Sequence, residues 1–481
     1  MALRHGVYTQ ESPTPLQPPV RVDSAIPCAF GAAPVHRLDK PLEAVNKPLI
    51  AFNYADCVQL AGYSDDWAQF TLCEVMYAQF RIFAIAPLIL VNIWNPLEGA
   101  QNIAKSLNVR NGMAEITDPM AIKSTLEVMA GELESELGTD YRLEYRGDTL
   151  RIIAIPGGNI TEAITSLAVT YQQAQPVALT ANDYIGGIDA HGTRTGFELA
   201  DEVFLRYQRN IGFLLAPGAP DSIELNVAMT SRAKNLNSGN FEAIALIDLP
   251  TTGDNANFRE LPAYKNSNSL VDPYQFLNWP CASLGERVFH ASTLLAGLHG
   301  RTDAESDGTP YVSSSNQHLP ITGVCDRDGN EFPVLDQSQA NFLGGNGIGT
   351  FLNWDGWTAW GNTTAAFPNN TDVKDNRRYI RRMFIWIKNT TNRSMWRNVD
   401  APVNKILIDG VLLSTNEWLN SLTARGALLG GRVEFLREDN PNIDLMQGRI
   451  FFRVHITPPM AAEEIVFDFS FDPNYLETLF E

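Results

Sequence analysis

The sequence predicts a multidomain protein of mixed α/β and α+β class, with extended arms at its two ends. Three observations support this prediction. The 481 residues are more than one ordinary hydrophobic core accommodates, so several domains are expected. Strand and helix patterns alternate along residues 183–375, which favours a mostly parallel sheet with crossover helices. Beyond the breaker Thr457-Pro458-Pro459 a strand pattern returns, with too few residues after it to enclose it in a core.

The N-terminal part is expected to contain an arm, residues 1–22, and an α/β region, residues 23–99. The arm joins a β-prone segment to a proline-rich stretch, which favours extended backbone. Its strand-forming residues are Val7, Tyr8, Thr9 and Gln10. A disordered leader is an equally weighted alternative. In the α/β region, helical periodicity from Trp67 to Phe80 precedes an apolar run, Ile82 to Val91, which is too short to span a bilayer and is predicted to be a buried strand.

Residues 100–182 are predicted to form an inserted α+β domain. An amphipathic helix is expected to begin at Asp118-Pro119 and to continue to Leu137, because apolar residues recur there at helical spacing. Two strands, 141–145 and 149–155, should follow. A second helix at 161–173, after a Pro-Gly-Gly turn, completes the expected unit.

Residues 183–375 are predicted to form an α/β domain with long loops. Helices are expected at 197–207 and 222–234, and strands at 211–216 and 241–249. Residues 300–372 are rich in Gly, Asn, Ser and Asp, which is typical of loops.

Residues 376–462 are predicted to form a C-terminal domain that begins with a basic amphipathic helix. The arginines of interest on this helix are Arg377, Arg378, Arg381 and Arg382. Two interpretations stay open: the arginines pair with acids elsewhere in the chain, or they form a patch that docks onto an acidic neighbour. A capping box from Ser414 to Glu417 predicts the start of a second helix. Gly430-Gly431 predicts its end, before a strand at 432–436.

Residues 463–481 are predicted to form a second arm. The large apolar residues on one face of its strand pattern are Ile465, Phe467, Phe469 and Phe471. These side chains must be covered, either by this subunit's own sheet or by that of a neighbour. A strand that adds to a neighbour's sheet edge gains main-chain hydrogen bonds and side-chain pockets without a new core. Self-assembly is therefore the first function that the sequence suggests.

Composition argues against several classes of function. The net charge is −19, and all of it lies in residues 1–375, which argues against direct binding to nucleic acid. The five cysteines contain no C-x-x-C pair, so neither a disulfide framework nor a metal site is supported. No cofactor is expected.

Three motifs resemble functional sites but are expected to be turns. His191-Gly192-Thr193 resembles the histidine motif of subtilisin-like proteases, yet no matching serine segment is present. The glycine-rich run Gly344–Gly349 lacks the Lys-Ser/Thr pair of a phosphate loop, and a flexible turn with several positive-φ residues is favoured. Asp326-x-Asp328-x-Asn330 is loosely calcium-like, but a solvated turn is favoured. We therefore expect that the chain is not an enzyme.

Several segments together resemble the tail sheath proteins of contractile phages, R-type bacteriocins and related injection machines, most closely the P2-like branch. In the first three quarters of the chain these segments are Gly31–Pro34, Asn46–Ile50, Ile211–Gly218 and Trp360–Thr364, the last with Thr363 where arginine is usual. In the last quarter they are Gly426–Arg432, Gln447-Gly448, Thr457–Pro459, Ala462-Glu463 and Tyr475–Leu479. The likeness is dispersed over most of the chain and weakest at 100–182 and 300–350.

The resemblance implies an inner α+β domain built from N- and C-terminal parts, with α/β domains inserted outward. It implies hexameric rings stacked helically around an inner tube, which contract to drive the tube through a cell envelope. The arms of neighbouring subunits would complete one another's sheets. The implied tube-facing residues are Glu417, Asn420, Ser421 and Arg425.

The resemblance also implies partners and a location. The partners are further copies of this chain, a tail tube protein, and baseplate and tail terminator proteins, with no direct contact to nucleic acid and no membrane insertion. The location is a virion tail assembled in the cytoplasm of the host bacterium. Two other functions stay open. A subtilisin-like hydrolase would react with a fluorophosphonate probe and lose that reaction on His191→Ala. Another structural component of the same particle is the second alternative.

Overall fold

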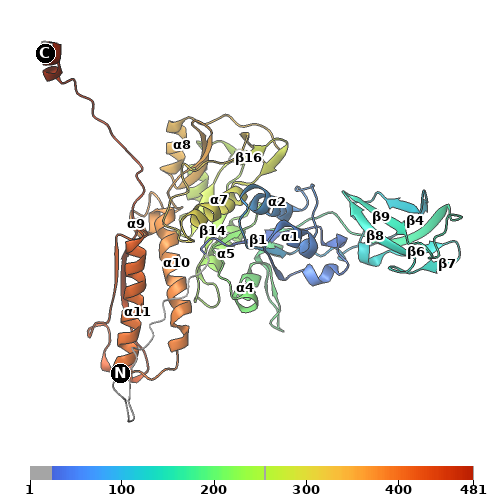
Figure 1. The fold of residues 1–481 in the computed structure, drawn as a ribbon, viewed down its shortest axis with the longest axis horizontal. Coiled ribbons are helices and arrows are strands. Elements are labelled where there is room, and N and C mark those ends of the chain that lie inside the picture. Colours follow the sequence, from blue (N-terminus) through green and yellow to red (C-terminus); the bar gives the residue numbers. More distant parts are fainter. Residues whose placement is uncertain (1–23, 254–255, 480–481) are drawn as a thin grey trace, which may run out of the picture.

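The computed structural model describes residues 24–253 and 256–479. The expected strand of the N-terminal arm, residues 7–10, lies outside the described residues. Figure 1 shows a central α/β body, a β domain that projects from one side of it, and a helical C-terminal unit on the other side, from which the chain extends away. The architecture is therefore mixed α/β and multidomain, as the alternating strand and helix patterns predict.

An eight-stranded sheet organises the central body. Its strand order is β2 (Pro48–Ala51), β3 (Leu88–Asn92), β1 (Pro27–Gly31), β13 (Phe213–Leu215), β14 (Ile244–Asp248), β15 (Gln275–Asn278), β19 (Ile348–Asn353) and β20 (Trp357–Trp360). Neighbouring strands from β3 to β19 are parallel, whereas the edge strands β2 and β20 pair antiparallel. The expected mostly parallel sheet is confirmed, with shorter strands than the sequence pattern predicts at 211–216 and 241–249.

Helices connect the strands and cover both faces of this sheet. They are α1 (Tyr54–Ala61), α2 (Thr71–Tyr77) with the π-helical turn η3 (Ala78–Ile82), α4 (Ala200–Tyr207), α5 (Ile223–Lys234), α6 (Leu261–Ser267), α7 (Ala291–Glu305) and α8 (Gln337–Gly344). Ser222 caps α5, because its hydroxyl accepts a hydrogen bond from the Leu225 N–H at 3.3 Å. The apolar run expected to be a strand from Ile82 to Val91 is a strand only in its second half: Ile82 ends η3, residues 83–87 form a connection, and β3 begins at Leu88. Pro87 cannot donate to the ladder, and β3 begins at the next residue.

Short elements complete the body. They are η1 (Val35–Arg37), η2 (Pro41–Ala44), α3 (Ala181–Ile185), β11 (Gly187–Ile188), β12 (Arg194–Thr195), η5 (Gly196–Leu199), β16 (Cys281–Leu284), β17 (Arg287–Phe289) and β18 (Gly323–Cys325). The core lies on both faces of the large sheet, since successive residues of β1 point in opposite directions. Phe30 packs with Phe197 on the face of α4 and α5, and Ala29 packs with Leu72 on the face of α2.

The β domain, residues 101–173, corrects the prediction for the insert. It contains β4 (Gln101–Asn108), β5 (Met113–Ile116), η4 (Lys123–Thr125), β6 (Glu127–Ala130), β7 (Leu133–Ser135), β8 (Tyr141–Arg146), β9 (Thr149–Ala154) and β10 (Ser166–Gln173). The expected strands at 141–145 and 149–155 are confirmed, but the helices expected at 118–137 and 161–173 are wrong. In β10, Leu167, Val169 and Tyr171 are buried and alternate with exposed residues. This two-residue period is that of a strand and not of the expected helix.

The β domain has its own hydrophobic core and also contacts the body, since Arg37 pairs with Asp148 at 2.6 Å and Lys123 with Asp39 at 2.8 Å. Val128, Leu150 and Val169 belong to this core. The two ends of the domain meet, because Gln101 of β4 is the register partner of Gln173 of β10.

The C-terminal unit consists of two long helices and a two-stranded sheet. Its elements are α9 (Val373–Asn376), α10 (Arg378–Met395), η7 (Trp396–Asn398), α11 (Lys405–Ala424), β21 (Gly430–Glu434), α12 (Asn442–Met446) and β22 (Arg453–Thr457). Trp386 of α10, Trp418 of α11 and Val433 of β21 lie in its core. Among the described residues, no helix combines the length and the apolar character that crossing a membrane requires.

The second long helix begins earlier than the capping box predicts. The side chain of Asn404 accepts a hydrogen bond from the Leu407 N–H at 2.9 Å and caps α11 there. Ser414 lies inside the helix, where its hydroxyl donates to the Val411 carbonyl at 3.3 Å. Gly430-Gly431 does not end the helix either, since these residues begin β21. Gly426, with φ of 75°, follows the helix instead.

Candidate assembly site

The C-terminal arm leaves the body at a root that two contacts hold in place. The Ala461 N–H donates a hydrogen bond to the Tyr379 hydroxyl at 3.0 Å. Arg377 forms an ion pair with Glu463 at 3.1 Å. Both partners lie at the N-terminal end of α10, so the extended part of the arm begins at residue 464.

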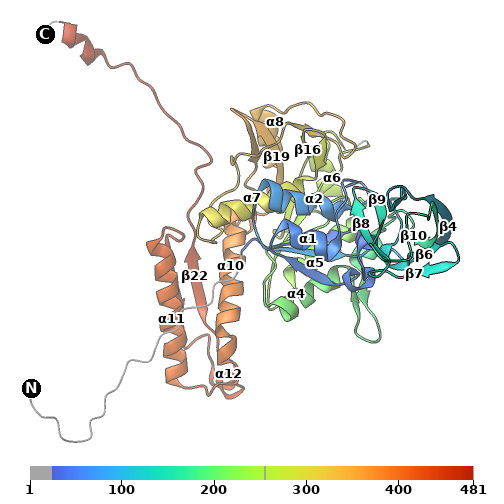
Figure 2. The ribbon, with the colours of Figure 1, turned by 45° about the vertical axis from the view of Figure 1, so that its right-hand side comes forward.

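Beyond this root, the arm carries large apolar side chains into solvent. Ile465, Phe467, Phe469 and Phe471 are 70%, 76%, 91% and 81% exposed. Residues 458–472 contain no helix or strand within the described chain, and the arm projects away from every domain (Figures 1 and 2). The short helix η8 (Pro473–Leu479) follows. The pattern of alternating apolar residues is therefore present without the sheet that it requires.

The two-stranded sheet of the C-terminal unit has one occupied edge and one open edge. On β21, the side chain of Asn416 from α11 accepts from the Val433 N–H at 2.9 Å and donates to the Val433 carbonyl at 3.3 Å. The backbone N–H and C=O of Val433 therefore point away from β22. Because Val454 is the register partner of Val433, its backbone N–H and C=O point away from β21 as well. The same alternation turns the N–H and C=O of Ile456 outward. Among the described residues, no hydrogen-bond partner reaches the outward groups of Val454 or Ile456.

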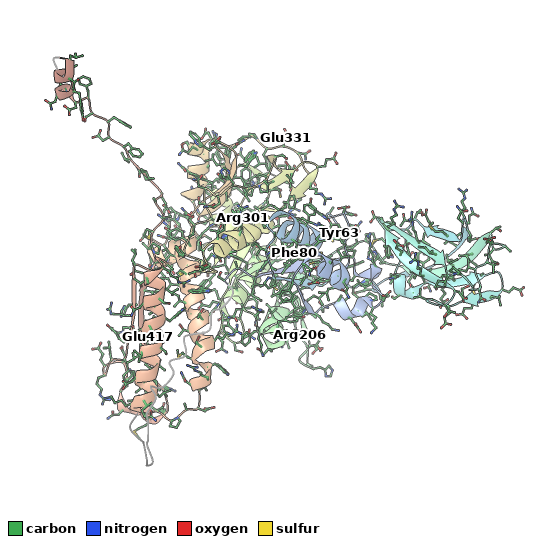
Figure 3. All side chains as sticks on the ribbon, in the orientation of Figure 1. Tyr63, Phe80, Arg206, Arg301, Glu331 and Glu417 are labelled. Atoms are coloured by element: carbon green, nitrogen blue, oxygen red, sulfur yellow. The ribbon has the colours of Figure 1, made fainter. Side chains whose placement is uncertain are left out.

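The predicted tube-facing residues lie on an exposed side of α11. Glu417, Asn420 and Ser421 are exposed and occupy one helical face, and Figure 3 shows Glu417 on α11. Arg425, just beyond the helix, forms an ion pair with Asp307 at 3.8 Å. Because the sequence predicted that this helix starts at Ser414, it missed the N-terminal half of the exposed face. There, Ile406 is 82% exposed and Leu413 is 50% exposed.

The expected basic docking patch is not an exposed surface, and that prediction is corrected. Arg378, Arg381 and Arg382 are only 4–5% exposed, and Arg377 holds the arm root. Arg382 forms a buried ion pair with Asp303 of α7. Arg381 pairs with Asp375 at 3.0 Å. The interpretation in which the arginines pair with acids within the chain therefore holds for Arg377, Arg381 and Arg382.

Arg378 joins the C-terminal unit to the central sheet without an acidic partner. Its guanidinium donates to the Thr363 carbonyl at 2.7 Å, the Asn278 side-chain oxygen at 2.8 Å and the Leu277 carbonyl at 2.6 Å. Burial lowers the pKa of Arg378 to about 9. Arg378 thus attaches α10 to β15.

The motifs tested for chemistry form turns. His191 lies exposed between β11 and β12, where the Asp189 carboxylate accepts from the His191 and Thr193 N–H groups, both at 2.8 Å. Asp326 accepts from the Asp328 and Asn330 N–H groups at 2.9 Å in the same manner. No group of three potential metal ligands is found in the described parts of the chain.

The glycine-rich run links α8 to β19 instead of opening a helix. Of its glycines, Gly347 has a positive φ of 77°. The expectation of several positive-φ residues there is therefore wrong.

Sequence reasoning missed a cluster of charged residues at the carboxyl end of the parallel strands. His290 donates its backbone N–H to the Glu74 carboxylate at 2.7 Å, and its ring Nδ1 lies 2.8 Å from the same carboxylate. Asp248, at the end of β14, accepts from the Ser292 N–H at 2.7 Å. Burial disfavours the charged imidazole, yet Glu74 and Asp248 raise the pKa of His290 to about 9. Two cavities adjoin this cluster: one of about 40 Å³ beside Asp248 and His290, and one of about 580 Å³ lined by Glu74 and His290.

Comparisons of the sequence with known proteins point in one direction. No family model matches the sequence. A curated tail sheath protein of Burkholderia phage BcepMu is 28% identical over 488 residues, which cover 99% of this chain and 98% of that protein. A putative prophage major tail sheath protein of Pseudomonas aeruginosa is 28% identical over 62% of this chain and 74% of that protein. The tail sheath protein of Escherichia phage P2 is 24% identical over 63% of this chain and 74% of that protein.

Solved structures have the same fold at low identity. The sheath of an extracellular contractile injection system, PVC, in its contracted state matches with a TM-score of 0.58 and 14% identity, and 99% of each chain is covered. A chain from the contracted anti-feeding prophage baseplate matches with a TM-score of 0.59 and 14% identity, covering 98% of this chain and 99% of that one. The curated homologues are structural tail sheath proteins and not enzymes. The predicted resemblance is thus confirmed: this chain has tail sheath proteins as its homologues and contractile injection system sheaths as its structural neighbours.

Proposed function

We propose that this chain is the structural subunit of a contractile tail sheath. It polymerises as stacked hexameric rings around an inner tube and contracts to drive the tube through a target cell envelope. The full-length relationship to a phage tail sheath protein and the shared fold support this role. One observation carries the proposal: an arm with exposed strand-patterned apolar side chains and an open sheet edge occur in the same chain.

The proposed linkage is strand addition between subunits. Residues 465–471 of one copy pair with the outer edge of β22 in a second copy, where the outward N–H and C=O groups of Val454 and Ile456 await partners. Each backbone hydrogen bond contributes about 1 kcal/mol net, so the bonds to two residues contribute roughly 4 kcal/mol. Burying a phenylalanine side chain contributes roughly 1.5–3 kcal/mol more. Residues 7–10 of the N-terminal arm are proposed to add a further strand.

The arm root explains how such a link could survive contraction. The ion pair of Arg377 with Glu463 and the bond from Ala461 to Tyr379 fix where the arm departs. Residues 464–472 beyond it have no regular structure in the described chain, so the body can rotate while the arm stays paired. In this mechanism no nucleotide is needed, because the extended lattice relaxes to one of lower free energy.

The remaining parts of the proposal concern partners and place. The exposed face of α11, with Glu417, Asn420 and Ser421 and with Arg425 just beyond it, is proposed to face the tail tube protein. Baseplate and tail terminator proteins are proposed to hold the two ends of the polymer. The place is a virion tail, assembled in the cytoplasm of the host bacterium, without contact to nucleic acid or insertion into a membrane.

Electron microscopy of the purified full chain tests the linkage. We expect tubes or rings from the wild type, and folded monomers from Phe469→Asp or from a chain that ends at Glu463. The arm beyond its root contacts none of the described body, so the thermal unfolding of the variants should match that of the wild type, which makes folding the internal control. Trp354→Ala, which changes an aromatic residue that is 69% exposed elsewhere, serves as the matched control and should polymerise. Monomers from the wild type in the presence of the tube protein, or polymers from both arm variants, would contradict the proposal.

A further inference from the structure

An apolar groove lies between α4 and the C-terminal end of α10. Its floor is formed by Phe204 and Phe241, whose ring centroids lie 4.6 Å apart. Leu205 and Trp396 border it and are 67% and 66% exposed. The groove encloses about 400 Å³, which is within the range of sites that bind a few large side chains. Exposed Trp beside apolar and Arg side chains is typical of the residues that dominate protein interfaces.

The polar lining of this groove is positively charged. Arg194 and Arg393 both line it, and neither forms an ion pair with any described residue. The Nε atom of Arg194 is buried and has no hydrogen-bond partner in the described structure. The acid beside them, Asp201, is already paired with Arg232 at 2.9 Å. The groove therefore offers two cations without an acidic partner next to an apolar floor, and one of them, Arg393, lies over the Phe204 ring at 6.0 Å from its centroid. Such a lining suits an acidic and apolar partner.

The same chain holds a segment with the complementary character. In the tail segment, defined here as residues 472–479, Tyr475, Leu476 and Leu479 are 75%, 52% and 76% exposed. In η8, a 3₁₀ helix with about three residues per turn, Leu476 and Leu479 lie on the same side and Tyr475 lies next to them. From Asp472 to the end, the sequence has three acidic residues and no Lys or Arg. Figures 1 and 2 both show η8 projecting away from α4, so η8 does not occupy the groove of its own chain.

We propose that the groove between α4 and α10 of one copy binds the tail segment of a second copy. The apolar side of η8 packs on Phe204 and Phe241, between Leu205 and Trp396, and the positive charge of Arg194 and Arg393 attracts the acidic segment. This inference rests on the proposed self-assembly and deepens it: strand pairing by residues 465–471 would be followed by a specific side-chain anchor. Strand addition alone is weakly selective in register, and an anchor in a shaped groove fixes the register.

Binding of a fluorescent peptide to the full-length chain tests the anchor separately from polymerisation. The peptide comprises residues 471–481, and fluorescence anisotropy measures its affinity. We expect Trp396→Ala and Arg393→Glu each to weaken binding roughly tenfold or more, since both remove groups typical of binding hot spots. Trp354→Ala should leave the affinity unchanged, because that exposed tryptophan lies on β20's hairpin and outside the groove. A peptide with Leu476→Asp should bind as weakly as the wild-type peptide binds to Trp396→Ala.

The outcomes separate this inference from the proposed function. No binding to the wild-type chain, or equal affinity for wild type and Trp396→Ala, overturns the groove anchor whatever electron microscopy shows. Binding that depends on Trp396 supports the anchor even if the wild type stays monomeric or both arm variants polymerise, which are the outcomes that contradict the proposed strand linkage. A photoreactive amino acid at position 476 locates the contact: crosslinks between differently labelled copies at residues 392–396 support the inference, and crosslinks confined to other regions refute it.

Discussion

Replacing Arg382 tests whether the arginines of α10 hold the fold or form a docking surface. Arg382 and Asp303 form an ion pair in which the side chains are 3% and 4% exposed. The guanidinium also lies 4.9 Å from the centre of the Phe213 ring. Arg382→Met keeps most of the side-chain volume but leaves the buried Asp303 carboxylate without its cation, with the Ser24 hydroxyl as a remaining hydrogen-bond donor. Removing one partner of a buried pair costs about 3–5 kcal/mol.

Urea unfolding of the dilute monomer measures this cost, and Arg377→Met is the matched control. The ion pair of Arg377 with Glu463 is partly exposed, at 22% and 37%, so its loss should cost less than about 1 kcal/mol. The double variant Arg382→Met with Asp303→Leu should recover much of the lost stability, because no unpaired charge remains. An Arg382→Met protein that unfolds at the wild-type urea concentration and fails only in assembly would refute the reasoning and restore the docking patch.

Three further predictions follow from the described contacts. The pKa of His290 is raised to about 9, so its charge contributes roughly 3 kcal/mol to the free energy of unfolding. This contribution is fully present below pH 6.5 and is lost as the pH rises through 9. The stability difference between wild type and His290→Gln, measured from pH 6 to 10, should therefore shrink, and a constant difference would contradict this prediction. Asn416→Ala leaves the Val433 N–H and C=O without their partner and should lower the free energy of unfolding by about 1–3 kcal/mol, whereas Asn420→Ala on the exposed face should change it little. Gly347→Ala should destabilise by more than about 1 kcal/mol, because φ is 77° and a Cβ would lie 2.5 Å from the Thr364 carbonyl oxygen, while Gly344→Ala meets open space; equal thermal stabilities of the two variants would argue against this strain.

The sequence predicted the parallel strands β13 and β14 because each carries a local signal. Their residues are all buried apart from Asp248, and continuous apolar runs between helical patterns are typical of parallel strands. The strand β15 was not predicted, because Gln275 and Asn278 at its two ends are polar although buried. The insert was predicted poorly because two periods compete in it. Leu133 and Leu137 fit a helical spacing, yet they are 60% and 52% exposed, while the alternation that buries Val128 and Ala130 decides the structure.

The assembly site was predicted in part, for a related reason. The apolar alternation of residues 465–471 is local, so the arm could be found from the sequence. Which edge of the two-stranded sheet stays open depends on Asn416, because its side chain binds Val433 at the outer edge of β21. No local sequence pattern predicts this contact. The partners of Arg378 and Arg382 are likewise distant in the chain, at Asn278 and Asp303, so a run of arginines could not be assigned to the interior. Hydrogen bonds and ion pairs between residues far apart in the chain could therefore not be predicted from the sequence.

The meeting of Gln101 and Gln173 at the base of the β domain makes that domain exchangeable. Register partners in an antiparallel pair lie about 5 Å apart, so the chain of the body is interrupted by a single short gap. An exchange would also remove the ion pairs of Asp148 with Arg37 and of Lys123 with Asp39. A foreign domain whose own ends lie equally close can be spliced in at this place without stretching the eight-stranded sheet. In a polymer of identical subunits, each copy would then carry the passenger at the same position, and the chain would serve as a scaffold for display at regular intervals.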